Sequence, residues 1–113
     1  MALSNVFVHH VFFRMKNPGS AEDRAALAAG LRKLSRLELI RDFHIGVPAG
    51  TGRDVVDNAY GISWLVFFAT AEDQDKYQEH PIHQEFVSEC SRLWDTVTVY
   101  DVIDAAAASS TNQ

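Results

Sequence analysis

The sequence predicts one α+β domain of the ferredoxin-like type, βαββαβ, with a four-stranded antiparallel sheet. Three observations predict it. Four segments are apolar and rich in β-branched or aromatic residues, two amphipathic helical segments lie between them in the required order, and 113 residues are enough for one core. In this fold both helical segments cover the same face of the sheet.

The first strand and the first helix have clear boundaries. Residues 6–15, VFVHHVFFRM, favour a strand and are followed by the turn sequence Asn-Pro-Gly. A helix is predicted for residues 20–37, because Ser20 and Asp23 resemble a capping box. Leucines follow at helical spacing, at Leu27, Leu31 and Leu34.

The middle of the chain predicts two strands joined by a long loop. Residues 39–47 alternate in polarity, which is typical of a half-exposed edge strand. Residues 48–58 are rich in Gly, Pro and Asp and predict a mobile loop. Residues 60–69 are almost continuously apolar and predict a buried strand.

A proline divides the second helical segment. The helix that begins at Ala71, capped by Thr70, is expected to end near His80, because Pro81 disfavours helical geometry before it and suits the first position of a new helix. One apolar face of this new helix is predicted from His83, Phe86, Val87, Cys90, Leu93 and Trp94. Residues 96–103 predict the last strand, so the domain spans residues 1–104 and residues 105–113 form a disordered tail.

Both faces of the central strands are apolar, although the helices can cover only one. In the first strand Phe7, His9, Val11, Phe13 and Met15 alternate with Val6, Val8, His10 and Phe12. The sequence therefore predicts a homodimer through the uncovered face. That face is expected to comprise Val8, His10, Phe12, Leu65 and Phe67.

The composition and the N-terminal sequence argue against nucleic-acid binding, a membrane span and secretion. A net charge of −5 gives no basic surface for nucleic acid. No apolar run reaches the length of a membrane span, and the N-terminus lacks the pattern of a secretory signal. The one cysteine, Cys90, excludes an intramolecular disulfide, so we expect a cytoplasmic protein.

Three histidines have simple structural interpretations. His9 lies among apolar residues and fits a core histidine that is hydrogen-bonded to a neighbour. His10 points to the opposite face, where a role in the dimer interface is favoured. His44, on the expected edge strand, fits a solvated or half-buried polar residue.

The stretch YQEHPIH, residues 77–83, carries the strongest chemical signal. A phenol and an imidazole that reach one cavity can transfer a proton and stabilise an oxyanion, which makes Tyr77 and His83 candidate catalytic residues. The alternative is that both side chains only brace the break at Pro81.

Two motifs resemble a known family. HHVFFRMK, residues 9–16, is similar to the opening strand of the stress-responsive dimeric A/B barrel (Dabb) domain, and YQEHPIHQEFV, residues 77–87, is similar to its Tyr…His-Pro-x-His helix signature. The resemblance extends over residues 6–103 and implies a homodimeric barrel with a cavity between sheet and helices.

The resemblance also implies site residues. A plant cyclase of this family closes a linear polyketide by an aldol condensation without a cofactor, and its catalytic tyrosine and histidine match Tyr77 and His83. His9 matches a histidine of its pocket, whereas Ile62 replaces another one. The residues expected to bind substrate are His9, Ile62, Trp64, Phe86 and Trp94.

Metal and nucleotide sites have little support. His80 and His83 have a spacing that metal ligands use, but Pro81 lies between them and no acidic partner accompanies them. GTGRD in the long loop lacks the ending of a phosphate loop. We therefore expect no metal and no cofactor.

Two functions remain open. The first is a cofactor-free cyclase or lyase that acts on a small apolar carbonyl compound, with His83 as base and Tyr77 as oxyanion donor. The second is a non-catalytic, stress-associated dimer that binds a small molecule. The related antibiotic-biosynthesis monooxygenases have less support from the motifs.

Overall fold

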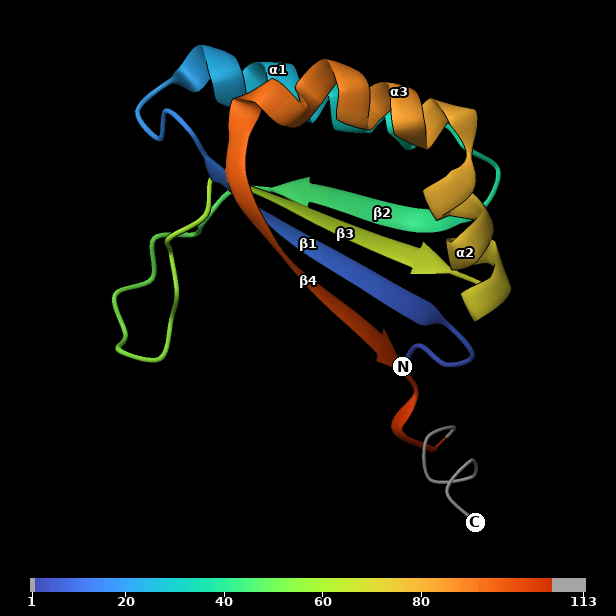
Figure 1. Ribbon diagram of the computed structural model, residues 1–113. Coiled ribbons are helices and arrows are strands. Elements are labelled where there is room, and N and C mark those ends of the chain that lie inside the picture. Colours follow the sequence, from blue (N-terminus) through green and yellow to red (C-terminus); the bar gives the residue numbers. More distant parts are fainter. Residues whose placement is uncertain (1, 107–113) are drawn as a thin grey trace.

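The computed structural model describes residues 2–106 and has the ferredoxin-like fold that the sequence predicts (Figure 1). The elements are β1 (Phe7–Met15), α1 (Ala21–Leu34), β2 (Ile40–Gly46), β3 (Ile62–Phe68), α2 (Ala71–Glu79), α3 (Pro81–Cys90), the 3-10 turn η1 (Ser91–Leu93) and β4 (Trp94–Ile103). Residues 107–113, most of the predicted tail, lie outside the described residues.

The sheet places β1 at its centre. The strand order is β2-β3-β1-β4 and the described pairings are all antiparallel, so β2 is an edge strand as predicted and β4 is the other edge. In this register His9 lies opposite Val66 on one side and Asp101 on the other. The β1 and β3 strands therefore form the middle of the sheet, and β1 pairs with the edge strand β4.

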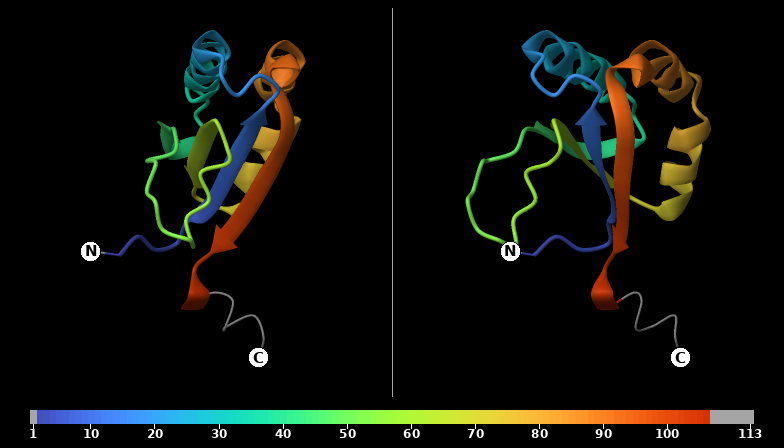
Figure 2. Two further views of the ribbon diagram at one scale, coloured as in Figure 1. Left: turned by 90° about the vertical axis from the view of Figure 1, so that its left-hand side faces the viewer. Right: turned by 60° about the vertical axis from the view of Figure 1, so that its left-hand side comes forward.

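All three helices lie on one face of the sheet, called the inner face here (Figures 1 and 2). The core between the two layers includes Trp64, Phe68 and Leu31, each at most 1% exposed. The α1 and α3 helices approach closely because Gly30 has no side chain: a Cβ atom there would lie 2.6 Å from Sγ of Cys90.

The opposite, outer face carries no helix (Figure 2). By strand pairing it includes Val8, His10, Phe12, Arg14, Asp42, His44, Ser63, Leu65, Phe67, Thr98, Tyr100 and Val102. Tyr100 and Val102 are 60% and 50% exposed. The irregular segment of residues 47–61 projects away from the sheet (Figure 1); its mobility stays a prediction.

The capping residues act as the sequence predicts. The Ser20 and Thr70 hydroxyls accept hydrogen bonds from the backbone N–H groups of Asp23 and Asp73, both at 3.1 Å. At the break, His80 is extended and its Nδ1 accepts from the N–H of Ile82 at 3.0 Å. His80 is therefore the N-cap of α3, with Pro81 as the first helical residue.

The predicted apolar face of the last helix needs a correction. The α3 helix ends at Cys90, Leu93 lies in η1, and Trp94 begins β4 opposite Met15. The helical period continued in the sequence, but the β-branched residues that follow Trp94 favour a strand, so the chain turns earlier. Val87 is 39% exposed and lies off the buried stripe.

Candidate functional site

Three predicted site residues come together from three elements. His9 lies in the middle of β1, Tyr77 in the last turn of α2, and His83 in the first turn of α3. The Tyr77 ring contacts both imidazoles, with centroid distances of 5.8 Å to His9 and 4.7 Å to His83. The break at Pro81 turns the chain so that both helices present these side chains to the inner face of the sheet.

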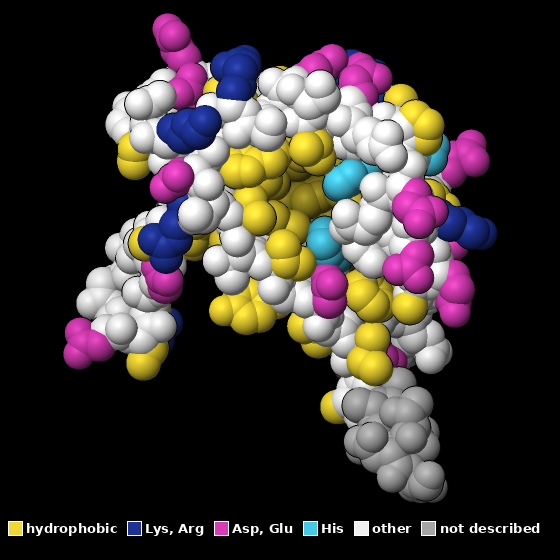
Figure 3. Space-filling view, viewed as in Figure 1, with side chains coloured by type: hydrophobic (Ala, Val, Ile, Leu, Met, Phe, Trp, Pro, Cys, Tyr) yellow, Lys and Arg dark blue, Asp and Glu magenta, His cyan; other side chains and the backbone are white. Residues whose placement is uncertain are grey.

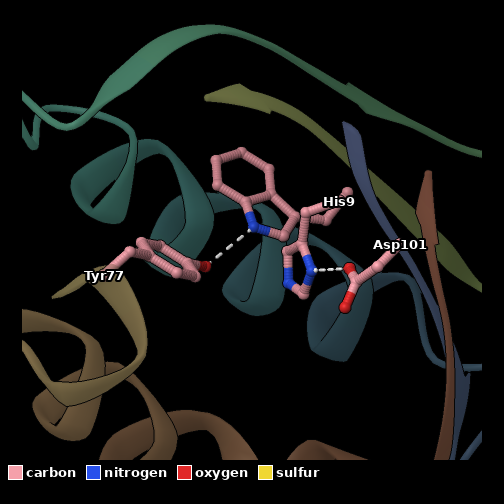
Figure 4. A network of polar contacts seen from close by, with 4 residues as sticks. His9, Tyr77 and Asp101 are labelled. Atoms are coloured by element: carbon pink, nitrogen blue, oxygen red, sulfur yellow. Dashed lines mark hydrogen bonds and ion pairs between the residues drawn. The ribbon is translucent and has the colours of Figure 1, made fainter. Parts of the chain in front are cut away.

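Tyr77 is held as a neutral hydrogen-bond donor. Its hydroxyl oxygen accepts a hydrogen bond from the indole N–H of Trp64 at 3.1 Å (Figure 4). Burial raises the pKa of Tyr77 to about 12, and the bond from Trp64 acts in the opposite direction. Since the oxygen already accepts a bond, the hydroxyl proton is available to a ligand oxygen. The residue is 1% exposed, so a ligand reaches the phenol only after a neighbouring side chain moves.

His83 has the properties of a neutral base. The side chain is half-buried, and this burial lowers its pKa below the ordinary value; the neighbouring His9 lowers it further, while a hydrogen bond with the backbone of Gln78 raises it. At neutral pH the imidazole is therefore uncharged and can accept a proton.

His9 forms a pair that the sequence did not reveal. Its Nδ1 lies 2.6 Å from Oδ1 of Asp101 (Figure 4). A carboxylate at Nδ1 favours the tautomer in which that nitrogen carries the proton, so Nε2 keeps its lone pair. His9 is 5% exposed, whereas the Asp101 side chain is 45% exposed at the edge of the sheet. The only sequence signal for Asp101 is an acidic residue inside an apolar strand.

An aromatic wall adjoins this group. Phe86 lies 6.4 Å from His83 and stacks on Trp94 with centroids 5.8 Å apart. Phe13 packs against Trp94 at 4.8 Å. Ile62 and Trp64, which the resemblance also placed in the pocket, are 3% and 1% exposed on the inner face of β3. They lie in the core, where Trp64 holds the phenol of Tyr77.

The molecule is hollowed between the helix layer and β4. Figure 3 shows hydrophobic side chains on the floor of this hollow and histidine side chains at its edge. Val97, Val99 and Ile103 lie on the inner face of β4 and are 43%, 44% and 47% exposed. The helices therefore leave this edge of the sheet partly open to a ligand.

The described residues contain no group of three or more His, Cys, Asp or Glu side chains placed to hold a metal ion. The imidazole of His80 caps α3 through Nδ1. No helix within residues 2–106 is long and apolar enough to cross a membrane.

Comparison with known proteins decides the family. Residues 7–104 match the profile of the Stress Responsive A/B Barrel Domain, Dabb. The chain belongs to the Dabb family. No curated protein matches the sequence.

Solved structures share this Dabb fold. The protein At3g17210 of Arabidopsis thaliana is similar at 24% identity and a TM-score of 0.75, over 88% of this chain and 95% of that chain. A hydroxynitrile lyase of Passiflora edulis is similar at 18% identity and a TM-score of 0.75, over 88% and 93% of the two chains. A protein of Thermobifida fusca described as dimeric, ferredoxin-like and of unknown function is similar at 14% identity and a TM-score of 0.72, over 88% and 91%.

Proposed function

We propose that this Dabb protein is a cofactor-free cyclase or lyase that transfers a proton on a small, largely apolar carbonyl compound. One observation carries the proposal: a neutral phenol, Tyr77, contacts two imidazoles beside a hollow with a hydrophobic floor. The hydroxynitrile lyase with the same fold supports it, since that name describes a lyase on this architecture.

The chemistry needs one base and one oxyanion donor. His83 takes a proton from the carbon next to a carbonyl group, and the electron pair of the C–H bond moves to form the enolate. Tyr77 donates its hydroxyl hydrogen bond to the enolate oxygen. In a cyclase the enolate carbon then attacks a second carbonyl of the same polyketide-like chain, and the His83 imidazolium returns the proton to the new alkoxide. Such general acid–base transfer contributes about 10²–10⁴-fold to a rate.

Asp101 orients the imidazole of His9, the third polar side chain of the site. With Nδ1–H directed at the carboxylate, 2.6 Å away, Nε2 of His9 can accept a hydrogen bond from a ligand hydroxyl. The carboxylate also stabilises an imidazolium if His9 takes the proton. Asp101 is therefore a positioning residue in this proposal, because it acts through His9.

A second function is favoured by the burial of the phenol. Tyr77 is 1% exposed and its oxygen is already bonded to Trp64. A protein that only binds a small apolar molecule on the aromatic wall of Phe13, Phe86 and Trp94 needs no access to that hydroxyl. This is the non-catalytic, stress-associated alternative.

The protein is also proposed to act as a homodimer through the outer face. Phe12, Leu65 and Phe67 lie on that face and are only half-buried within one chain, and no helix covers them. Similar structures described as dimeric support this assembly. A second sheet packed on this face removes the apolar side chains from water.

Product analysis tests the enzyme against the binding protein. The protein is incubated with an alkyl-substituted poly-β-keto thioester and with an aromatic cyanohydrin, with and without EDTA. In the cyanohydrin the base would take the hydroxyl proton, and the C–CN bond would break to give the aldehyde and cyanide, which leaves as HCN. The proposal predicts a cyclised or cleaved product that needs the protein and is formed equally with the chelator. Tight binding of these compounds without any product would favour the binding function instead.

A further inference from the structure

The outer face carries a polar cluster that the proposed reaction does not use. It comprises His10 on β1, Ser63 on β3 and His44 on β2, three strands that lie next to one another. Nε2 of His10 lies 2.7 Å from Oγ of Ser63, and Ser63 is 7% exposed. The imidazole of His10 also lies against the Phe12 ring, with centroids 4.2 Å apart.

The absence of a side chain on Gly46 leaves room for the His44 ring near Ser63. Gly46 pairs with Ser63, and a Cβ atom on Gly46 would lie 2.9 Å from Cε1 of His44. The His44 ring therefore lies over Gly46, beside the position of Ser63. Both imidazoles therefore lie on the same face of the sheet, near Ser63.

Few other charged groups face His10. On β1 the next ionic residue of the outer face is Arg14, which is paired at 3.8 Å with Asp57 of the 47–61 segment. On β4 Tyr100 pairs directly with His10, and on β2 the face carries His44 and Asp42. Asp42 pairs with Phe67 rather than with a residue next to His10. The β3 strand contributes Ser63, Leu65 and Phe67, which are uncharged. No carboxylate in the described residues is hydrogen-bonded to His10.

We propose that the dimer formed through the outer face is acid-sensitive, and that protonation of His10 drives the two copies apart. The inference rests on the proposed homodimer. A second sheet on this face encloses His10 among Phe12, Leu65 and their counterparts, where a charged imidazole is costly without a carboxylate partner. Protonated His44 adds repulsion of the same sign.

The direction of the effect follows from proton linkage. Burial lowers the pKa of His10 already within one chain, and His44 and His9 lower it further. Packing the second sheet removes more water from the imidazole, so the dimer binds fewer protons than two monomers. Dimer stability is therefore complete above the His10 pKa of the monomer and is lost as the pH falls below it. The Ser63 hydroxyl can donate to neutral His10 or accept from its protonated form, so it does not oppose the change.

Sedimentation equilibrium between pH 4.5 and 7.5 tests the proposal on the full chain. Each dimer takes up as many as two protons, so the dissociation constant is expected to rise by up to about 100-fold per pH unit within the titration range. Because the His10 pKa lies below its ordinary value of 6.5, we expect little change from pH 7.5 to 6.5 and a rise at lower pH. The His10→Gln variant should lose most of this dependence. His80→Asn, which removes a distant imidazole but keeps an N-cap side chain, should retain it.

Each result decides a different point. A monomer at every pH at micromolar concentration would overturn the homodimer and this inference together. A dimer whose dissociation constant does not change with pH would overturn the inference and leave the homodimer intact. A full pH dependence in His10→Gln would also overturn it. If Gln disturbs the sheet, His10→Phe replaces it as the variant without a titrating imidazole, because Phe is already present at the neighbouring position 12.

Discussion

Nδ1 of His9 lies 2.6 Å from Oδ1 of Asp101, so the first and the last strand of the sheet contribute to one hydrogen-bonded pair. The two residues are 92 positions apart in the sequence and directly opposite in the β1–β4 pairing. This relationship joins the site to the edge of the sheet.

Replacing the carboxylate by an amide tests the orienting role of Asp101. In Asp101→Asn the amide N–H can donate to Nδ1, which favours the opposite tautomer and places a proton on Nε2 of His9. We expect kcat to fall by about one to two orders of magnitude, with the fold retained. Asp95→Asn, on the same strand, is the matched control and should keep the wild-type kcat. An unchanged kcat in Asp101→Asn would remove Asp101 from the mechanism.

The pKa of His83 predicts the acidic side of the pH–rate profile. Its folded pKa lies below the ordinary value of 6.5, so the neutral base predominates above pH 6.5. As the pH falls through the lowered pKa, kcat/KM should fall with a slope of one. Tyr77, with a pKa of about 12, should cause no loss up to pH 10. A profile that already declines between pH 8 and 7 would contradict this assignment.

The bond between Trp64 and Tyr77 predicts a change in stability. Tyr77→Phe leaves the buried indole N–H without an acceptor, so the free energy of unfolding should fall by about 1–3 kcal/mol. Urea denaturation measures it. In a double-mutant cycle with Trp64→Phe, the double variant should lose less than the sum of the two single variants. Strict additivity would show that the 3.1 Å hydrogen bond contributes nothing.

The sequence predicted the elements better than the geometry of the site. The capping residues, the break at Pro81 and the alternation in the first strand depend on local spacing, and the structure confirms all of them. Asp101 was missed because strand order and register depend on the whole sheet. Trp94 was placed on a helix because its spacing continued a helical period, although the chain had already turned into β4. Tyr77 and His83, which the family resemblance matched to catalytic residues, do contact each other, and their catalytic role stays a prediction.

An acidic residue on the outer face tests the dimer. Phe12→Asp or Phe67→Asp would bury an unpaired charge between two sheets, so each should shift the protein to a monomer at micromolar concentration. Val87→Asp is the matched control, because Val87 is 39% exposed on α3, on the opposite side of the sheet. Light scattering gives the mass. A dimer that survives both substitutions would place the interface elsewhere.

The most direct test of the proposed chemistry is the turnover number of His83→Ala on a poly-β-keto thioester. The account predicts a loss of about two or more orders of magnitude in kcat, since the variant lacks the base. Tyr77→Phe should lose less and keep its affinity, and His44→Ala, whose imidazole is exposed on the other side of the sheet, should match the wild type. If His83→Ala turns over the substrate at the wild-type rate, the proton-transfer site proposed here is wrong.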